Sequence, residues 1–138
     1  MKLSTVTAVS AICFGCTLGL SAPAWSDGPV FNGTFRFVSD DGSTSTWVVT
    51  PCGTGCAHVV SDTGYVNVDA QLVDGQWRFT YTHPAAWDCE DGTDAPGTRH
   101  VTLDAATLRG TVAQGPDMVC GETDVVEEAY GFALNQIG

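Results

Sequence analysis

The feature that most constrains the fold is a period-two alternation of apolar and polar residues that runs through the chain after residue 27. Successive side chains of an extended strand point to opposite faces, so this alternation is typical of strands with one buried face. Clusters of glycine, proline, aspartate and threonine divide it into eight runs, near residues 31–37, 46–50, 57–61, 66–72, 77–82, 101–103, 108–112 and 130–134. No helical period stands out, and the pattern therefore predicts an all-β domain of about eight strands.

The Asp74-Gly75 pair fixes the register of one hairpin. Aspartate followed by glycine is typical of a two-residue turn in which both central residues take positive φ. The turn pairs Val73 with Gln76, and the partners that follow are Leu72 with Trp77, Ala70 with Phe79 and Val68 with Tyr81. Those apolar residues then share one face, so the turn and the hydrophobic pattern agree on this register.

Short strands in direct succession predict an antiparallel meander, closed as a small barrel or folded as a two-sheet sandwich. In a meander the connecting loops alternate between the two ends of the strands. The end that we call the long-loop end then collects the loops near residues 40–43, 62–65, 84–98 and 114–129. The loops near residues 51–56, 74–75 and 104–107 lie at the other end, the short-loop end.

Four cysteines lie beyond residue 26, and four cysteines allow three pairings. Cys52 and Cys56 fall in one turn at the short-loop end, whereas Cys89 and Cys120 fall in two loops at the long-loop end. A mixed pair would span the length of the strands, far beyond the roughly 7 Å that a disulfide permits between Cα atoms. The meander therefore predicts the disulfides Cys52–Cys56 and Cys89–Cys120.

Residues 1–26 have the three parts of a secretory signal peptide: a basic start at Lys2, an apolar core over residues 6–20 and a small-residue cleavage site. We expect cleavage after Ala24 or after Ser26. A retained membrane anchor is the alternative, because the apolar stretch is nearly long enough to span a bilayer. Cleavage would leave residues 27–138 as one secreted domain, extracellular or in the cell envelope, where disulfides form.

The expected secreted part is strongly acidic, with 16 acidic residues, four arginines and no lysine, which gives a formal net charge of −12. Nucleic acids and anionic membrane surfaces are bound through clustered basic residues, so we expect neither as a partner. In the meander most of the acidic residues gather at the long-loop end. We take that end as the candidate binding rim, represented by Asp40, Asp41, Trp87, Asp88, Glu90, Asp91 and Asp94.

No motif for catalysis or metal binding emerges. The nucleophile pattern Gly-x-Ser-x-Gly is missing, and His58, His83 and His100 lack the spacing of zinc ligands. The acidic segment 88–94 offers oxygen ligands for calcium, but its glycine is one place early for an EF-hand and no glutamate closes the loop. We therefore expect no enzyme and no cofactor, with calcium as the alternative.

Several short stretches carry a resemblance to a known group of proteins: residues 31–35, 45–47, 52–56 and 88–97, together with Cys120. With the signal peptide, they resemble small secreted proteins of mycobacteria and related actinobacteria. The resemblance implies export and a disulfide-containing β domain, and it implies no catalytic residues.

These observations favour a monomeric, non-enzymatic secreted or envelope protein that binds a partner or ligand through its acidic long-loop end. One alternative is a lipocalin-like carrier of a small apolar ligand, which a solvent-reachable cavity lined by Trp77 and Phe79 would favour. A small hydrolase using two rim carboxylates, one with a raised pKa, is the other alternative. A flat rim with an exposed Trp87 would favour partner binding.

Overall fold

The computed structural model describes residues 30–117, 119–121 and 126–138. The expected signal peptide lies outside these residues. The described part is all-β, without a helix, and its strands are β1 (Gly33–Ser39), β2 (Thr44–Gly53), β3 (Cys56–Ser61), β4 (Asn67–Val73), β5 (Gln76–Asp88), β6 (Asp94–Asp104), β7 (Arg109–Asp117) and β8 (Val126–Gln136). Among the described residues, no helix is long and apolar enough to cross a membrane.

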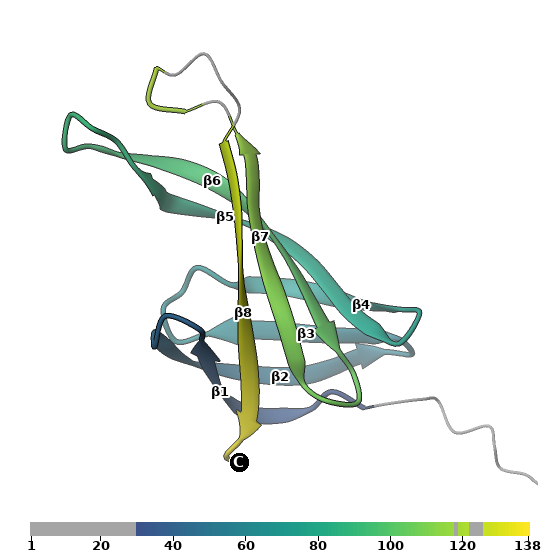
Figure 1. Cartoon of the computed structure of the whole chain (residues 1–138). Coiled ribbons are helices and arrows are strands. Elements are labelled where there is room, and N and C mark those ends of the chain that lie inside the picture. The colour runs from purple at the N-terminus through teal and green to yellow at the C-terminus, as the bar shows by residue number, and fades with distance from the viewer. Residues whose placement is uncertain (1–29, 118, 122–125) are drawn as a thin grey trace, which may run out of the picture.

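The eight strands form a closed barrel, which decides between the two architectures that the sequence allows. Each strand pairs antiparallel with the next, and β8 returns to pair with β1 (Figure 1). In that closing pair Phe37 lies opposite Leu134. Closure gives every strand a paired neighbour on both sides, and it makes every second side chain of the barrel strands point into a common interior.

The hairpin between β4 and β5 has the register that its turn predicts. Asp74 and Gly75 both have positive φ, at 51° and 79°. Val73 pairs with Gln76 next to the turn, and Leu72 pairs with Trp77 beyond it. The predicted register is confirmed for these pairs, whereas the pairing of β4 with β5 ends at Gln71 and Arg78 and does not reach the predicted pairs Ala70–Phe79 and Val68–Tyr81.

Two other hairpins are longer than the sequence pattern predicts. Most of segment 84–98, which we expected to be a loop, is strand, because β5 runs to Asp88 and β6 begins at Asp94. Bulges interrupt the pairing between His83 and Trp87 and again between Gln114 and Asp117, and a bulge breaks the period-two alternation. The β5–β6 and β7–β8 hairpins consequently extend beyond the rest of the barrel (Figure 1).

Inward-facing apolar side chains fill the middle and the short-loop end of the barrel. The Trp47 ring lies 5.7 Å from the rings of both Phe79 and Phe132, measured between centroids. At the short-loop end Phe31 closes the interior, with its ring 5.2 Å from Phe35 and 5.6 Å from Trp77. The remaining buried apolar residues are Val49, Ala57, Val59, Val66, Ala70, Val101, Leu103, Val112 and Leu134.

The structure contains the two disulfides that the meander predicts. Cys52–Cys56 closes the β2–β3 turn, with 5.0 Å between Cα atoms. Cys89–Cys120 has 5.5 Å between Cα atoms and joins the ends of the two extended hairpins. The first bridge therefore holds a local turn, whereas the second holds together two elements that are distant in sequence.

Removing the second bridge should destabilise the protein more than removing the first. The paired cysteines are 31 and 4 residues apart, so chain entropy predicts losses of about 3–4 and about 2 kcal/mol respectively. Urea unfolding of Cys89→Ser/Cys120→Ser and of Cys52→Ser/Cys56→Ser, each against the wild type, measures both losses. A larger loss of stability for Cys52→Ser/Cys56→Ser than for Cys89→Ser/Cys120→Ser would contradict this account of the bridges.

Candidate ligand-binding site

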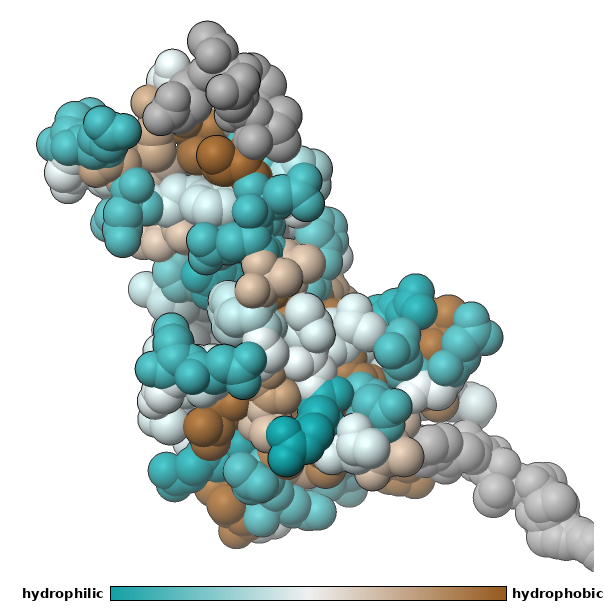
Figure 2. Space-filling model, viewed as in Figure 1, coloured by the Kyte–Doolittle hydropathy of each residue, from teal (hydrophilic) through white to brown (hydrophobic). Residues whose placement is uncertain are grey.

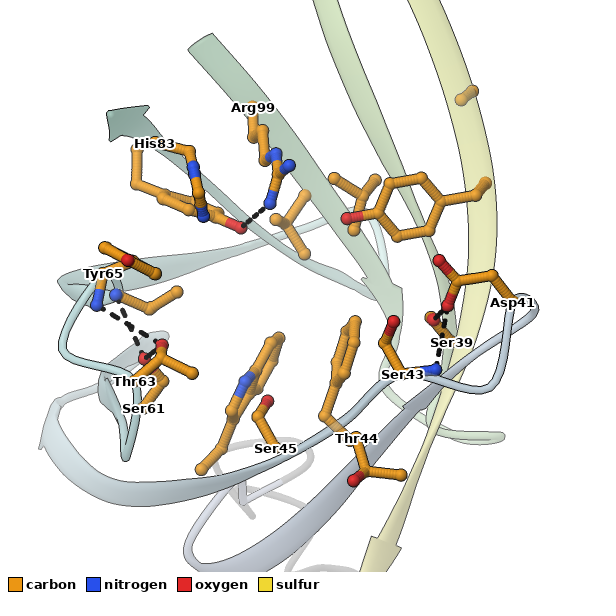
Figure 3. Close-up of a pocket in the computed structure, with 18 of the residues that line it drawn as sticks. Ser39, Asp41, Ser43, Thr44, Ser45, Ser61, Thr63, Tyr65, His83 and Arg99 are labelled. Carbon is orange, nitrogen blue, oxygen red and sulfur yellow. Dashed lines mark hydrogen bonds between the residues drawn. The ribbon is translucent and has the colours of Figure 1, made fainter. Parts of the chain in front are cut away.

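A cavity of about 560 Å³ opens at the long-loop end of the barrel. Its lining residues come from seven of the eight strands and from the turns before β2 and β4. Figure 3 shows Arg99 and His83 on the side of the cavity opposite Ser45. The volume lies within the roughly 300–1,000 Å³ that is usual for small-molecule sites in proteins.

The cavity exists because small residues replace large ones at inward-facing positions. Two aromatic residues of the interior are each paired across the strands with a serine: Phe37 with Ser45, and Trp47 with Ser61. Ser39 continues the inward face of β1 beyond Phe37. Ser39 and Ser61 are almost fully buried, yet their side chains are too small to fill the space above the aromatic rings.

The floor of the cavity is apolar and aromatic. The rings of Phe37 and Trp47 are stacked, with an interplanar angle of 22° and 5.2 Å between centroids. Val101 and Val112 line the cavity beside them. Such a floor can hold a flat apolar group by van der Waals contact and by exclusion of water.

The opposite wall carries Arg99, whose position is fixed by a buried glutamine. Arg99 and Gln114 are cross-strand partners, and Arg99 Nε donates a hydrogen bond to Gln114 Oε1 at 2.5 Å. Gln114 is only 1% exposed, and its Nε2 donates to the carbonyl oxygen of Ala86 at 2.8 Å. Arg99 Nη1 also donates to Tyr81 Oη at 3.4 Å. Neutral groups therefore orient this cation.

The cavity contains one permanent positive charge beside two carboxylates. Asp41 and Glu128 line it together with Arg99, but no carboxylate of the described residues forms an ion pair with Arg99. The one contact between a basic and an acidic side chain in the described part of the chain joins His58 Nδ1 to Asp69 Oδ1, at 2.6 Å. Asp41 already accepts hydrogen bonds from the Ser39 hydroxyl and from the Ser43 backbone N–H.

Two further titratable groups of the cavity are neutral at pH 7. Burial lowers the pKa of His83 from 6.5, and the positive charge of Arg99 lowers it further. Burial raises the pKa of Tyr130 above 10.0, although Arg99 opposes part of this rise. The Tyr130 hydroxyl therefore keeps its proton and is available as a hydrogen-bond donor.

The structure divides the candidate binding rim that we inferred from the sequence. Asp40 and Asp41 lie in the β1–β2 turn, where Asp41 lines the cavity and Asp40 accepts a hydrogen bond from the Gly131 N–H at 3.0 Å. The other carboxylates of the rim lie at the end of the β5–β6 hairpin, away from that turn (Figure 1): Asp88, Glu90, Asp91 and Asp94. The expected rim is therefore two separate groups of residues.

Trp87 lies in β5 near the end of the same hairpin, and its side chain is half-buried. The indole Nε1 donates a hydrogen bond to Asp117 Oδ2 of β7 at 2.9 Å. Trp87 thus connects the two extended hairpins.

Among the described residues, neither group of rim carboxylates brings three ligand atoms within 4.8 Å of one another. Asp91 accepts hydrogen bonds from both the backbone N–H and the hydroxyl of Thr93, and these bonds lower its pKa. At the other end of the barrel Cys52, Cys56 and Asp69 lie within 4.8 Å of one another, but the two sulfur atoms are bonded in a disulfide. Disulfide sulfur does not supply the thiolate that metal ions bind.

Sequence reasoning missed Arg99 and the serines of the cavity. The available signal was the presence of Ser39, Ser45 and Ser61 on the inward side of strands that otherwise bury large residues. Trp77 and Phe79, which the carrier alternative would place in a ligand cavity, are buried in the core and do not line this cavity; Trp77 borders a smaller hollow of about 270 Å³ at the short-loop end.

Comparison of the chain with protein-family models, with curated proteins and with solved structures finds no match. The function proposed below therefore derives from the geometry of the cavity.

The carboxyl group of Asp41, in the turn at the cavity entrance, should make the stability of the protein depend on pH. Hydrogen bonds from Ser39 and Ser43 lower the pKa of Asp41 from 3.8 to about 2. Because the folded pKa is the lower one, the stabilising contribution is full above pH 3.8 and is lost as the pH falls through about 2. The stability advantage of the wild type over Asp41→Asn should therefore shrink between pH 5 and pH 2.

Urea unfolding at several pH values measures this difference, and Asp94→Asn controls for the loss of one negative charge. An advantage over Asp41→Asn that stays constant across the range would show that the carboxylate is not held as described.

Proposed function

We propose that this protein is a non-enzymatic binding protein that holds one small molecule in the mouth of its barrel. The cavity of about 560 Å³, with its aromatic floor and hydroxyl-rich wall, carries the proposal. An eight-stranded barrel is just wide enough either to be filled by side chains or to hold one small ligand. Here the large apolar side chains end at Phe37 and Trp47, and the space beyond them is open.

Binding inside the cavity has better support than docking of a protein on the acidic rim. The expected rim residues lie in two places, and Trp87 is engaged with Asp117. On the face shown in Figure 2 hydrophobic residues form small separate spots among hydrophilic ones. The large hydrophobic residues that are exposed in the described structure belong to different elements: Val30, Val48, Tyr65, Val73 and Ile137.

A hydrolase with two rim carboxylates has no comparable support. A general acid in such a site needs a raised pKa, so that it keeps its proton at neutral pH. The shifted carboxyl groups of the described residues, those of Asp41, Asp91 and Asp104, all have lowered pKa values.

We propose that the protein binds its ligand outside the cytoplasm. The apolar segment at the start of the chain supports export, and the two disulfides support an oxidising compartment. The protein would then act as a small extracellular or envelope carrier, comparable in principle to a lipocalin.

A neutral fluorescent probe tests for an accessible cavity without assuming a charged ligand. N-phenyl-1-naphthylamine should bind saturably, one probe per chain, and should quench tryptophan emission because Trp47 forms part of the floor. Ser45→Trp places a large ring inside the cavity and should weaken binding about tenfold or more. Fluorescence titration measures both effects.

Val48→Trp is the matched control, because Val48 lies on the same strand, is 48% exposed and does not line the cavity. This variant should bind the probe like the wild type. No saturable binding to the wild type, or equal affinity in Ser45→Trp shown to be folded by circular dichroism, would refute the proposed function.

A further inference from the structure

The guanidinium of Arg99 retains free hydrogen-bonding capacity toward the cavity. An arginine side chain has five N–H donors. Among the described residues Arg99 uses two of them, from Nε to Gln114 and from Nη1 to Tyr81. Both acceptors are neutral, and no described carboxylate pairs with this charge. Figure 3 shows Arg99 at the cavity wall, where a bound molecule could accept the remaining hydrogen bonds.

This guanidinium is also held in place before any ligand arrives. Gln114 is 1% exposed, and its amide nitrogen is bonded to the Ala86 carbonyl, so the amide oxygen is directed at Arg99 Nε. Holding a long side chain in its binding position reduces the entropy that binding would otherwise remove. The bonded pair is therefore suited to receive a ligand rather than only to complete the fold.

The neighbouring groups favour a single carboxylate as the partner of Arg99. A planar carboxylate can accept two parallel hydrogen bonds from one guanidinium, and the Tyr81 and Tyr130 hydroxyls line the same cavity. A phosphate dianion would bring a second negative charge into a hollow that Asp41 and Glu128 also line. A cation would meet the unpaired charge of Arg99, while Asp41, one of the two carboxylates of the cavity, is already bonded to Ser39 and Ser43.

We infer that the ligand of this cavity is a small monocarboxylate with a flat apolar body. Its carboxylate accepts hydrogen bonds from Arg99, and its body lies against the rings of Phe37 and Trp47. This inference rests on the proposed function, because it names the chemical class of the molecule that the cavity holds.

Three probes that share one ring system and differ in charge test the inference: 2-naphthylacetate, 2-naphthylacetamide and 2-(2-naphthyl)ethylammonium. Titration of tryptophan fluorescence at pH 7.5 gives the three affinities. The acetate should bind about tenfold or more tightly than the neutral amide, and the ammonium should bind most weakly.

Substitution of Arg99 separates its charge from the rest of the cavity. Arg99→Gln should lower the affinity for the acetate about tenfold or more and the affinity for the amide much less, so that the preference for the acetate disappears. Arg99→Lys keeps the charge but loses the planar pair of donors, so its affinity should be intermediate. Arg78→Gln removes the same charge from the exposed outer face of β5 and should change none of the three affinities.

The outcomes distinguish this inference from the function on which it rests. Equal affinities for acetate and amide, tightest binding of the ammonium, or an Arg99→Gln variant that retains the acetate preference would each overturn the inference and leave the binding function standing. If the three probes fail but N-phenyl-1-naphthylamine binds, the inference again fails alone. If all four probes fail, both proposals are refuted.

Discussion

The pairing of β8 with β1 is the interaction on which the rest of the structure depends. Once the sheet closes, every second residue of each strand faces one interior whose width is set by eight strands. Large apolar residues fill that interior from the short-loop end as far as Phe37 and Trp47. Beyond that level the inward positions carry Ser39, Ser45 and Ser61, and the same closure that buries the core encloses a hollow. The cavity is thus a direct product of residue size at inward positions.

The two extended hairpins give the hollow its polar wall. Tyr81 and Arg99 lie on β5 and β6, and Tyr130 lies on β8, so all three belong to the strands that continue beyond the barrel. The Cys89–Cys120 disulfide joins these hairpins at their ends, and the hydrogen bond from Trp87 to Asp117 joins them nearer the barrel. The disulfide and the hydrogen bond therefore hold the two hairpins, one of which carries Arg99, in a fixed position relative to each other. A preorganised binding site requires such fixed positions.

The sequence predicts most of the fold but little of the site. Alternation predicts the all-β class, Asp74-Gly75 predicts a hairpin register, and the meander predicts both disulfides, because each of these depends on local pattern or on chain order. The predicted end of β5 was wrong, because a bulge after His83 breaks the period on which the prediction relied, and β6 begins at Asp94, earlier than predicted. Arg99 was missed because its role depends on Gln114, a residue adjacent only through strand pairing. Whether the interior of a barrel is filled depends on the side-chain volumes at inward-facing positions that pair across the strands. These pairs are known only when the register of every strand is known.

Chemical-shift mapping by nuclear magnetic resonance tests most directly the claim that the barrel mouth is the binding site. In a titration with 2-naphthylacetate the account predicts the largest shifts at the Trp47 indole N–H and at the Arg99 Nε–H. The indole N–H of Trp77, at the opposite end of the interior, should stay unchanged. Largest shifts at Trp77 or on the outer wall, with Trp47 and Arg99 unaffected, would contradict it.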